Sequence, residues 1–102
     1  MEFEFPASDR GEEWRRVVGY PEYIVSSHGR IYHSCKKWYP KVNFNSDGYK
    51  ILYLRRKKKF VHRVLAEAFM GSLKGRKVTH INKNRGWNLL NNLRIIEQYE
   101  QV

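Results

Sequence analysis

Apolar and polar positions alternate along the first half of the chain, and this pattern predicts short β-strands. The β-prone run 23–26 is followed by Ser27-His28-Gly29, whose residue types favour a turn. Residues 30–33 are therefore predicted to return as a second strand. A third strand is predicted over residues 38–42, interrupted by Pro40.

A further strand and turn are predicted in the middle of the chain. The run 45–48, with the sequence NSDG, is a strong turn signal because Asp-Gly readily accepts a positive φ angle. Residues 49–54 follow this turn as a strand. The basic run 55–59 is expected to form the tip of a hairpin that returns through Phe60 and Val61, which would gather five positive charges in one place.

The spacing of apolar residues changes after this hairpin. Val61, Val64, Leu65, Ala68 and Phe69 recur at helical spacing. The pattern therefore predicts an amphipathic helix over residues 62–70, which Gly71 is well suited to end.

The last third of the chain returns to short β-prone runs. Strands are predicted at residues 78–81 and 93–96, separated by the polar loop 82–88, and a final helix is expected from Glu97 onward. Taken with the earlier elements, this order predicts an α+β fold built from small antiparallel sheets.

The charge balance narrows the choice of partner. The 102 residues include 20 Lys and Arg against 10 Asp and Glu, which gives a net charge of +10 and a pI near 10.0. Such a protein attracts polyanions, so DNA, RNA and an acidic membrane are the candidates. A membrane is disfavoured because the basic run lies in a strand context rather than in an amphipathic helix, and because no apolar stretch reaches transmembrane length.

Cysteine usage and the first residues bear on the compartment. Cys35 is the only cysteine, which excludes an intrachain disulfide and a cysteine-based zinc site and favours a reducing, intracellular compartment. Residues 1–12 are acidic and lack a long apolar run, so we expect a flexible arm rather than a secretory signal or a transit peptide.

Four histidines are candidates for chemistry, and their contexts differ. His28 and His33 are expected to be structural or solvent-exposed. His62 opens the predicted helix, where either a phosphate contact or a half-buried structural role fits. His80 ends an apolar strand just before an asparagine-rich loop, and a neutral imidazole in such a place can take a proton from water. Trp87, in that loop, suits stacking on a base or ribose as well as a core or interface role.

Several motifs of this chain resemble those of HNH homing endonucleases. In residues 14–34, the order Trp, Gly-Tyr, Tyr-x-Val-Ser and Gly-Arg-x-Tyr-x-Ser is similar to the NUMOD4 module that precedes the nuclease domain in phage- and intron-encoded members. The segments 47–49, 61–69 and 78–96 resemble the family's next turn, helix and nuclease core. The matching module residues are Trp14, Gly19, Tyr20, Tyr23, Val25, Ser26, Gly29, Arg30, Tyr32 and Ser34.

The resemblance runs from about residue 13 to residue 98 and implies a domain organisation. Residues 1–12 would be the arm, 13–54 a NUMOD4-like β-module, and 55–102 an HNH-like nucleic-acid-binding core. It also implies a C-terminal ββα-metal (His-Me finger) element and a viral or phage origin.

The resemblance further implies site residues. His80 would be the general base and Asn92 would brace the loop, with Mg²⁺ or another divalent metal as cofactor. The sequence departs from the family pattern at the metal ligands, because Thr79 stands where an Asp is usual and Gln101 lies near the usual helix ligand. The residues expected to contact nucleic acid are Arg55, Arg56, Lys57, Lys58, Lys59, Arg63, Lys83 and Arg85.

Two functional hypotheses follow. The first is a nucleic-acid-binding protein of the HNH endonuclease family whose catalysis is weak or lost, acting on DNA or RNA alone or within a larger nucleoprotein assembly. The alternative is an active metal-dependent endonuclease that hydrolyses DNA with His80 as its base. No Asp or Glu occurs between Glu67 and Glu97, which favours the first because Mg²⁺ sites usually include a carboxylate.

Overall fold

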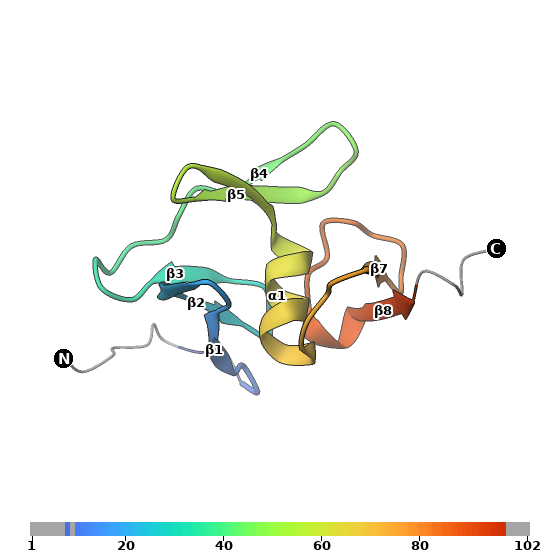
Figure 1. Cartoon of the computed structure of the whole chain (residues 1–102), viewed down its shortest axis with the longest axis horizontal. Helices are drawn as coiled ribbons and strands as arrows, with labels where there is room; N and C mark the ends of the chain where they lie inside the picture. Colours follow the sequence, from blue (N-terminus) through green and yellow to red (C-terminus); the bar gives the residue numbers. More distant parts are fainter. Residues whose placement is uncertain (1–7, 9, 98–102) are drawn as a thin grey trace.

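The N-terminal third of the protein forms a three-stranded antiparallel sheet. The computed structural model describes residue 8 and residues 10–97. In this sheet β2 is the central strand, and Val25 of β2 pairs with Ile31 of β3 (Figure 1). The strands are β1 (Trp14–Val17), β2 (Tyr20–Ser26) and β3 (Ile31–His33).

A second three-stranded sheet leads directly into the single described helix. Its strands are β4 (Asn43–Phe44), β5 (Lys50–Leu54) and β6 (Lys57–Phe60), and α1 (Val61–Met70) starts at the residue after β6. The helix ends at Gly71, whose φ of 94° suits glycine, as its C-cap position predicts.

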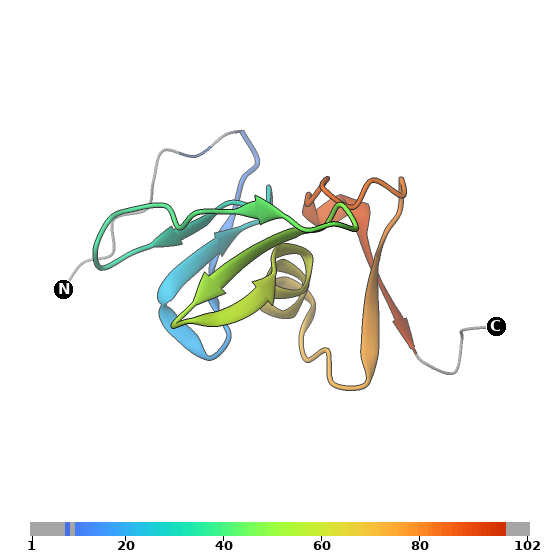
Figure 2. The same ribbon diagram turned by 90° about the horizontal axis from the view of Figure 1, so that it is seen from above.

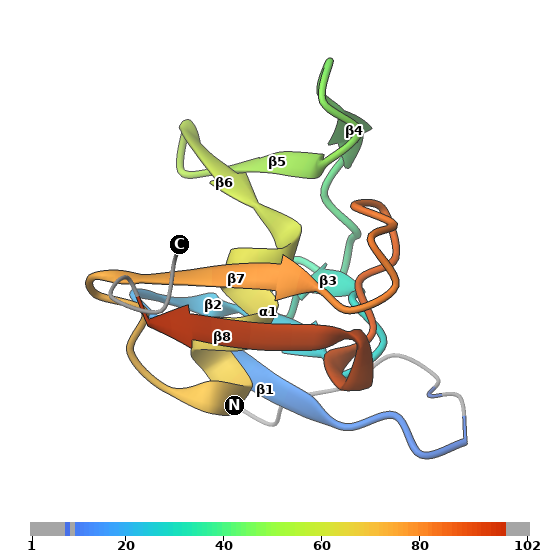
Figure 3. The ribbon, with the colours of Figure 1, turned by 90° about the vertical axis from the view of Figure 1, so that its right-hand side faces the viewer.

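The remaining elements form a separate hairpin on the other side of the helix. Strand β7 (Arg76–His80) pairs with β8 (Leu93–Glu97), and the 3₁₀ turn η1 (Leu90–Asn92) comes just before β8. Figure 2 shows α1 lying between the two three-stranded sheets and this hairpin, and Figure 3 shows β7 and β8 side by side.

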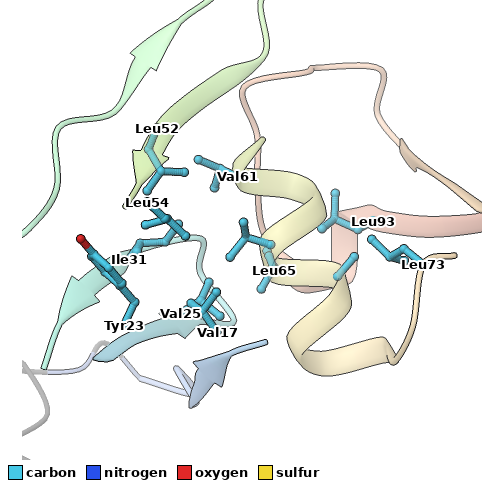
Figure 4. Close-up of a cluster of buried hydrophobic side chains, with 12 residues drawn as sticks. Val17, Tyr23, Val25, Ile31, Leu52, Leu54, Val61, Leu65, Leu73 and Leu93 are labelled. Carbon is cyan, nitrogen blue, oxygen red and sulfur yellow. The ribbon is translucent and has the colours of Figure 1, made fainter. Parts of the chain in front are cut away.

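One hydrophobic core joins all three sheets through the helix. Val61, Leu65 and Ala66 of α1 are buried, and side chains from the two larger sheets pack against one face of α1 (Figure 4). Leu93 of β8 and Leu73 complete the cluster beyond the helix. Because the same core holds each sheet, loops from different sheets keep fixed positions relative to one another.

The predicted α+β class with small antiparallel sheets is confirmed, but two predicted boundaries are wrong. Residues 38–42 do not form a strand: Trp38 makes one bridge to His33, and the next strand begins at Asn43. Pro40, which has no backbone N–H to donate, accounts for the gap. Residues 14–17 form β1, a strand that the apolar pattern alone did not separate from β2.

The basic run also differs from the prediction. Only Arg55 and Arg56 form the turn, with φ angles of 49° and 67°, and Lys57 already belongs to β6. Positive φ at both central residues is the geometry of a tight two-residue hairpin. At the C-terminus, Glu97 ends β8 rather than starting a helix, and residues 98–102 lie outside the described residues, so the final helix of the ββα element stays a prediction.

Candidate nucleic-acid interface and histidine site

His80 ends β7 with its side chain buried and fixed by a neighbouring amide. It pairs with Leu93 across the β7–β8 hairpin and is 5% exposed. Its Nε2 lies 2.8 Å from Oδ1 of Asn88. In the neutral imidazole, donation from Nε2 to this oxygen would leave the lone pair on Nδ1. That arrangement would give one ring nitrogen the form that a general base needs.

The position of Asn88 depends on a turn of the first sheet. Gly29 lies so close that a Cβ built on it would stand 2.2 Å from the backbone oxygen of Asn88, and its φ of +85° also favours glycine. Next to this contact, the N–H of Leu90 donates to the backbone oxygen of Ser27 at 2.7 Å. The turn between β2 and β3 thus supports the residue that holds His80.

Asn92 makes three hydrogen bonds across the loop between β7 and η1 (residues 81–89). Its Nδ2 donates to Oδ1 of Asn82 at 2.9 Å and to the backbone oxygen of Trp87 at 3.0 Å. Its Oδ1 accepts from the Asn82 N–H at 3.1 Å. These contacts suit the predicted bracing residue, and its role in function stays a prediction.

A second buried imidazole lies against the first. The ring of His62, from α1, is centred 5.0 Å from that of His80 and stacks on Tyr49 at 5.1 Å. Burial, followed by the nearby His80 and Arg63, lowers the pKa of His62 to about 4. His62 is therefore neutral at pH 7, and its Nδ1 has no hydrogen-bond partner within the described part of the chain. Of the two roles predicted for His62, the buried position favours the structural one.

Two cations lie beside His80 at the surface. A small hollow of about 230 Å³ is lined by Tyr49, Thr79, His80, Lys83 and Arg85, and we call it the histidine hollow. Arg85 is held over the Tyr49 ring at 4.8 Å and donates to the backbone oxygen of Asp47 at 2.9 Å. The hollow therefore combines a potential proton acceptor with two positive charges, which suits an anionic group such as a phosphate.

The described side chains around the histidine hollow do not suit a divalent metal ion. Thr79 offers a neutral hydroxyl, and none of the lining residues is a carboxylate. Among the described residues, no three His, Cys, Asp or Glu side chains gather as potential metal ligands. Gln101, at the other predicted ligand position, lies outside the described residues.

The other predicted basic residues lie in the β5–β6 turn, along β6 and in the first turn of α1. Arg55 forms a bidentate ion pair with Glu22, at 2.7 Å for both contacts, and this pairing lowers the pKa of the Glu22 carboxyl. Arg56 and Lys57 are exposed. Lys58 lies over the Phe60 ring, Lys59 lies over Tyr20, and half-buried Arg63 lines a shallow hollow together with both lysines. The structure thus divides the predicted binding residues into two groups: Lys83 and Arg85 beside His80, and the others on the β5–β6 hairpin and the start of α1.

Comparison with known proteins places these features in a family context. The sequence model of the NUMOD4 motif matches residues 12–55. The structure is similar to a solved structure described as DNA binding and cleavage by the HNH homing endonuclease I-HmuI. The TM-score is 0.71 and the identity 34%, over 85% of this chain and 53% of that one. The chain therefore carries a NUMOD4 motif, and its structure is similar to that of an HNH homing endonuclease.

The chain spans about half the length of the I-HmuI chain that it matches. A comparison with curated proteins gives no match. None of the described helices is long and apolar enough to cross a membrane.

The NUMOD4 motif includes residues that the sequence did not connect to His80. Gly29 was recognised as a motif residue, but its contact with Asn88 brings together positions 59 residues apart in the chain. Asn88 has no sequence signal of its own, since it is one of several asparagines in a polar loop and nothing local distinguishes it. His33 is buried, accepts the Lys36 N–H at Nδ1 and contacts the rings of Tyr23 and Trp38. Of the two predictions for His33, structural or solvent-exposed, its burial favours the structural one.

Proposed function

We propose that this relative of the HNH endonucleases binds DNA, with a backbone phosphate at the histidine hollow. The observation that carries the proposal is the placement of Lys83 and Arg85 beside the buried, amide-fixed His80. Cations at this point would hold a phosphate against the imidazole through charge-assisted hydrogen bonds. DNA is the expected partner because the structural relative is described as binding and cleaving DNA, and RNA is the other polymer to test.

The β5–β6 turn supports a second phosphate contact. Arg55 and Arg56 adopt left-handed backbone conformations, each of which costs a non-glycine residue about 1–2 kcal/mol. Asparagine and glycine would relieve this strain. Arg55 is paired with Glu22, whereas the exposed Arg56 at this strained turn favours a role for its charge. Phosphate contacts of this kind give affinity without sequence information.

We further propose that cleavage by this chain is weak or lost. His80 could take a proton from an attacking water at Nδ1, while Lys83 and Arg85 would stabilise charge on the phosphate. A metal ion would normally stabilise the leaving oxygen, and the described donor set does not suit one. The alternative, an active metal-dependent endonuclease, is favoured by the Asn88 contact, which prepares His80 as a base.

The deciding experiment combines binding with plasmid nicking. We expect tight binding to duplex DNA that weakens steeply as salt rises, since each neutralised phosphate releases counterions. With Mg²⁺ or Mn²⁺, supercoiled plasmid should be nicked slowly or not at all. Nicking that disappears in His80→Ala would establish the alternative, and salt-insensitive or absent binding would overturn the proposal altogether.

A gain-of-function variant sharpens this test. Thr79→Asp places a carboxylate next to His80, and Thr79→Asn is its uncharged match. If a missing carboxylate limits cleavage, metal-dependent nicking should appear or increase in Thr79→Asp only. It should vanish again when His80→Ala is added. Equal behaviour of the two Thr79 variants would mean that some other group limits the reaction.

A further inference from the structure

A second and larger hollow opens between the β4–β5 hairpin and the β7–η1 loop. Its volume is about 440 Å³, within the range of roughly 300–1,000 Å³ that is usual for small-ligand sites. Two aromatic side chains, Phe44 and Trp87, line it together with Lys50, Asn84, Asn88 and Leu89. We call it the aromatic hollow, and its lining is distinct from that of the histidine hollow.

The two aromatic rings of this hollow remain largely open to solvent. Phe44 is 65% exposed and Trp87 is 50% exposed. Because both rings stand around one concavity, they offer aromatic surface that is available for contact with a ligand. Lys50 extends its ammonium group over the Phe44 ring at 5.6 Å, which adds a positive charge beside the aromatic surface.

Close packing and hydrogen bonds fix both walls of the aromatic hollow. A Cβ at Gly86 would stand 2.9 Å from Cε1 of Phe44, so the ring lies directly against the loop backbone. Arg85 joins the loop to the β4–β5 turn through the backbone oxygen of Asp47. The backbone of Trp87 is held by Asn84 at 3.0 Å and by Asn92 at 3.0 Å. The Phe44 ring and the backbone that carries the Trp87 ring are thus positioned before any ligand arrives, which lowers the cost of binding.

We propose that the aromatic hollow binds a single unstacked nucleobase of the nucleic acid. Every base has a flat π face that stacks on aromatic side chains, whereas the strand that carries it is anionic. Phe44 and Trp87 supply the stacking surfaces, and Lys50 supplies the charge that suits the adjoining backbone. This inference rests on the proposed function, because the base is delivered by a strand that the basic residues already hold.

The position of the hollow relative to His80 supports this occupant. Asn88 lines the aromatic hollow and also holds Nε2 of His80. Lys83 and Arg85, which line the histidine hollow, belong to the same loop as Trp87. A strand with its phosphate beside His80 would therefore have a neighbouring base within reach of the aromatic rings. A base held between the aromatic rings would also keep the phosphate of its strand beside His80.

The test compares two DNA duplexes that differ by one unpaired adenine. Binding of the full chain is measured by fluorescence anisotropy, at low salt, to the bulged and to the fully paired duplex. We expect the bulged duplex to be preferred by roughly tenfold or more, as base–aromatic stacking predicts. Phe44→Ala and Trp87→Ala should each reduce this preference while leaving affinity for the paired duplex unchanged. Trp87→Phe should retain most of the preference.

Tyr53→Ala is the matched control. Tyr53 lies on β5, in the same sheet as Phe44, and its side chain is 55% exposed, but it does not line the aromatic hollow. It should leave the preference intact. Equal affinity of the wild type for both duplexes, or a preference that survives both alanine variants, would overturn the inference alone. If the protein bound neither duplex, or if its binding did not weaken with salt, the proposed function would be overturned, and this inference would fail with it.

Discussion

The β7–η1 loop and the β5–β6 turn both carry predicted binding residues with left-handed backbone, Lys83 in the loop and two arginines in the turn, but they differ in how their side chains are held. In the loop, asparagine side chains bond to one another and to the backbone, and the residue that fixes His80 is buried. In the turn, two arginines hold a strained backbone at an exposed position. The difference indicates that the loop is shaped to fix atomic positions, whereas the turn is shaped to display charge.

Substitution of Gly29 should have the largest effect, because it acts where the first sheet supports the loop. Gly29→Ala adds a Cβ that overlaps the backbone oxygen of Asn88, whereas Gly48→Ala meets nothing within 4 Å at a similar φ of +86°. The Gly48 variant isolates the backbone strain, about 1–2 kcal/mol. We expect Gly29→Ala to lose about 1–3 kcal/mol more in the free energy of unfolding. Urea unfolding measures the stability of both variants. An equal loss in the Gly29 and Gly48 variants would refute the support of Asn88 by this turn.

Removal of the Asn92 side chain should be the next largest effect. Asn92→Ala leaves the backbone oxygen of Trp87 and the N–H of Asn82 without this partner, at a cost of about 2–3 kcal/mol. Asn91→Ala, at the exposed neighbouring position, is the control and should change stability little. Amide hydrogen exchange should show faster exchange at Asn82 in the first variant. Similar stability of the two variants would mean that the loop does not depend on Asn92.

Acid should destabilise the protein through His62. Its pKa falls from 6.5 to about 4 on folding, so between these values the unfolded chain binds a proton that the folded chain does not. Stability therefore decreases as the pH falls through this window, by about 1.4 kcal/mol per unit at most. His62→Phe should flatten this part of the pH profile, while His28→Gln should not. An NMR titration that places the pKa of His62 near 6.5 would contradict the expectation.

The smallest stability change is expected at the turn, where it should have the opposite sign. Arg56→Gly relieves the left-handed backbone at φ 67° and should stabilise the protein by about 0.5–1 kcal/mol. The same change should weaken DNA binding and lower the salt slope by about 0.9, the loss of one phosphate contact. Arg56→Ala is the control, since it removes the charge but keeps the strain. Unchanged DNA affinity in both variants would show that the turn does not contact phosphate.

The two regions also differ in how far local sequence predicted them. The 55–59 run was recognised as a hairpin tip from composition alone, although the turn itself proved to be two residues long. The order of the strands and the position of the helix α1 followed from hydrophobic spacing. The predicted strand 38–42 does not form, because Pro40 has no backbone N–H to donate to a neighbouring strand. The strand β1 lacks a clear local signal because its two arginines obscure the alternation.

The sequence by itself determined the basic charge, the α+β class and the NUMOD4 motif, and it made His80 the candidate base. All of these depend on residue type and on spacing within a few positions. Only the tertiary structure showed that Gly29 supports Asn88, that Asn88 fixes the His80 ring, and that Phe44 faces the loop of Trp87. These contacts join residues from different sheets, and their distances are set by how the shared core packs around α1, which no local pattern specifies.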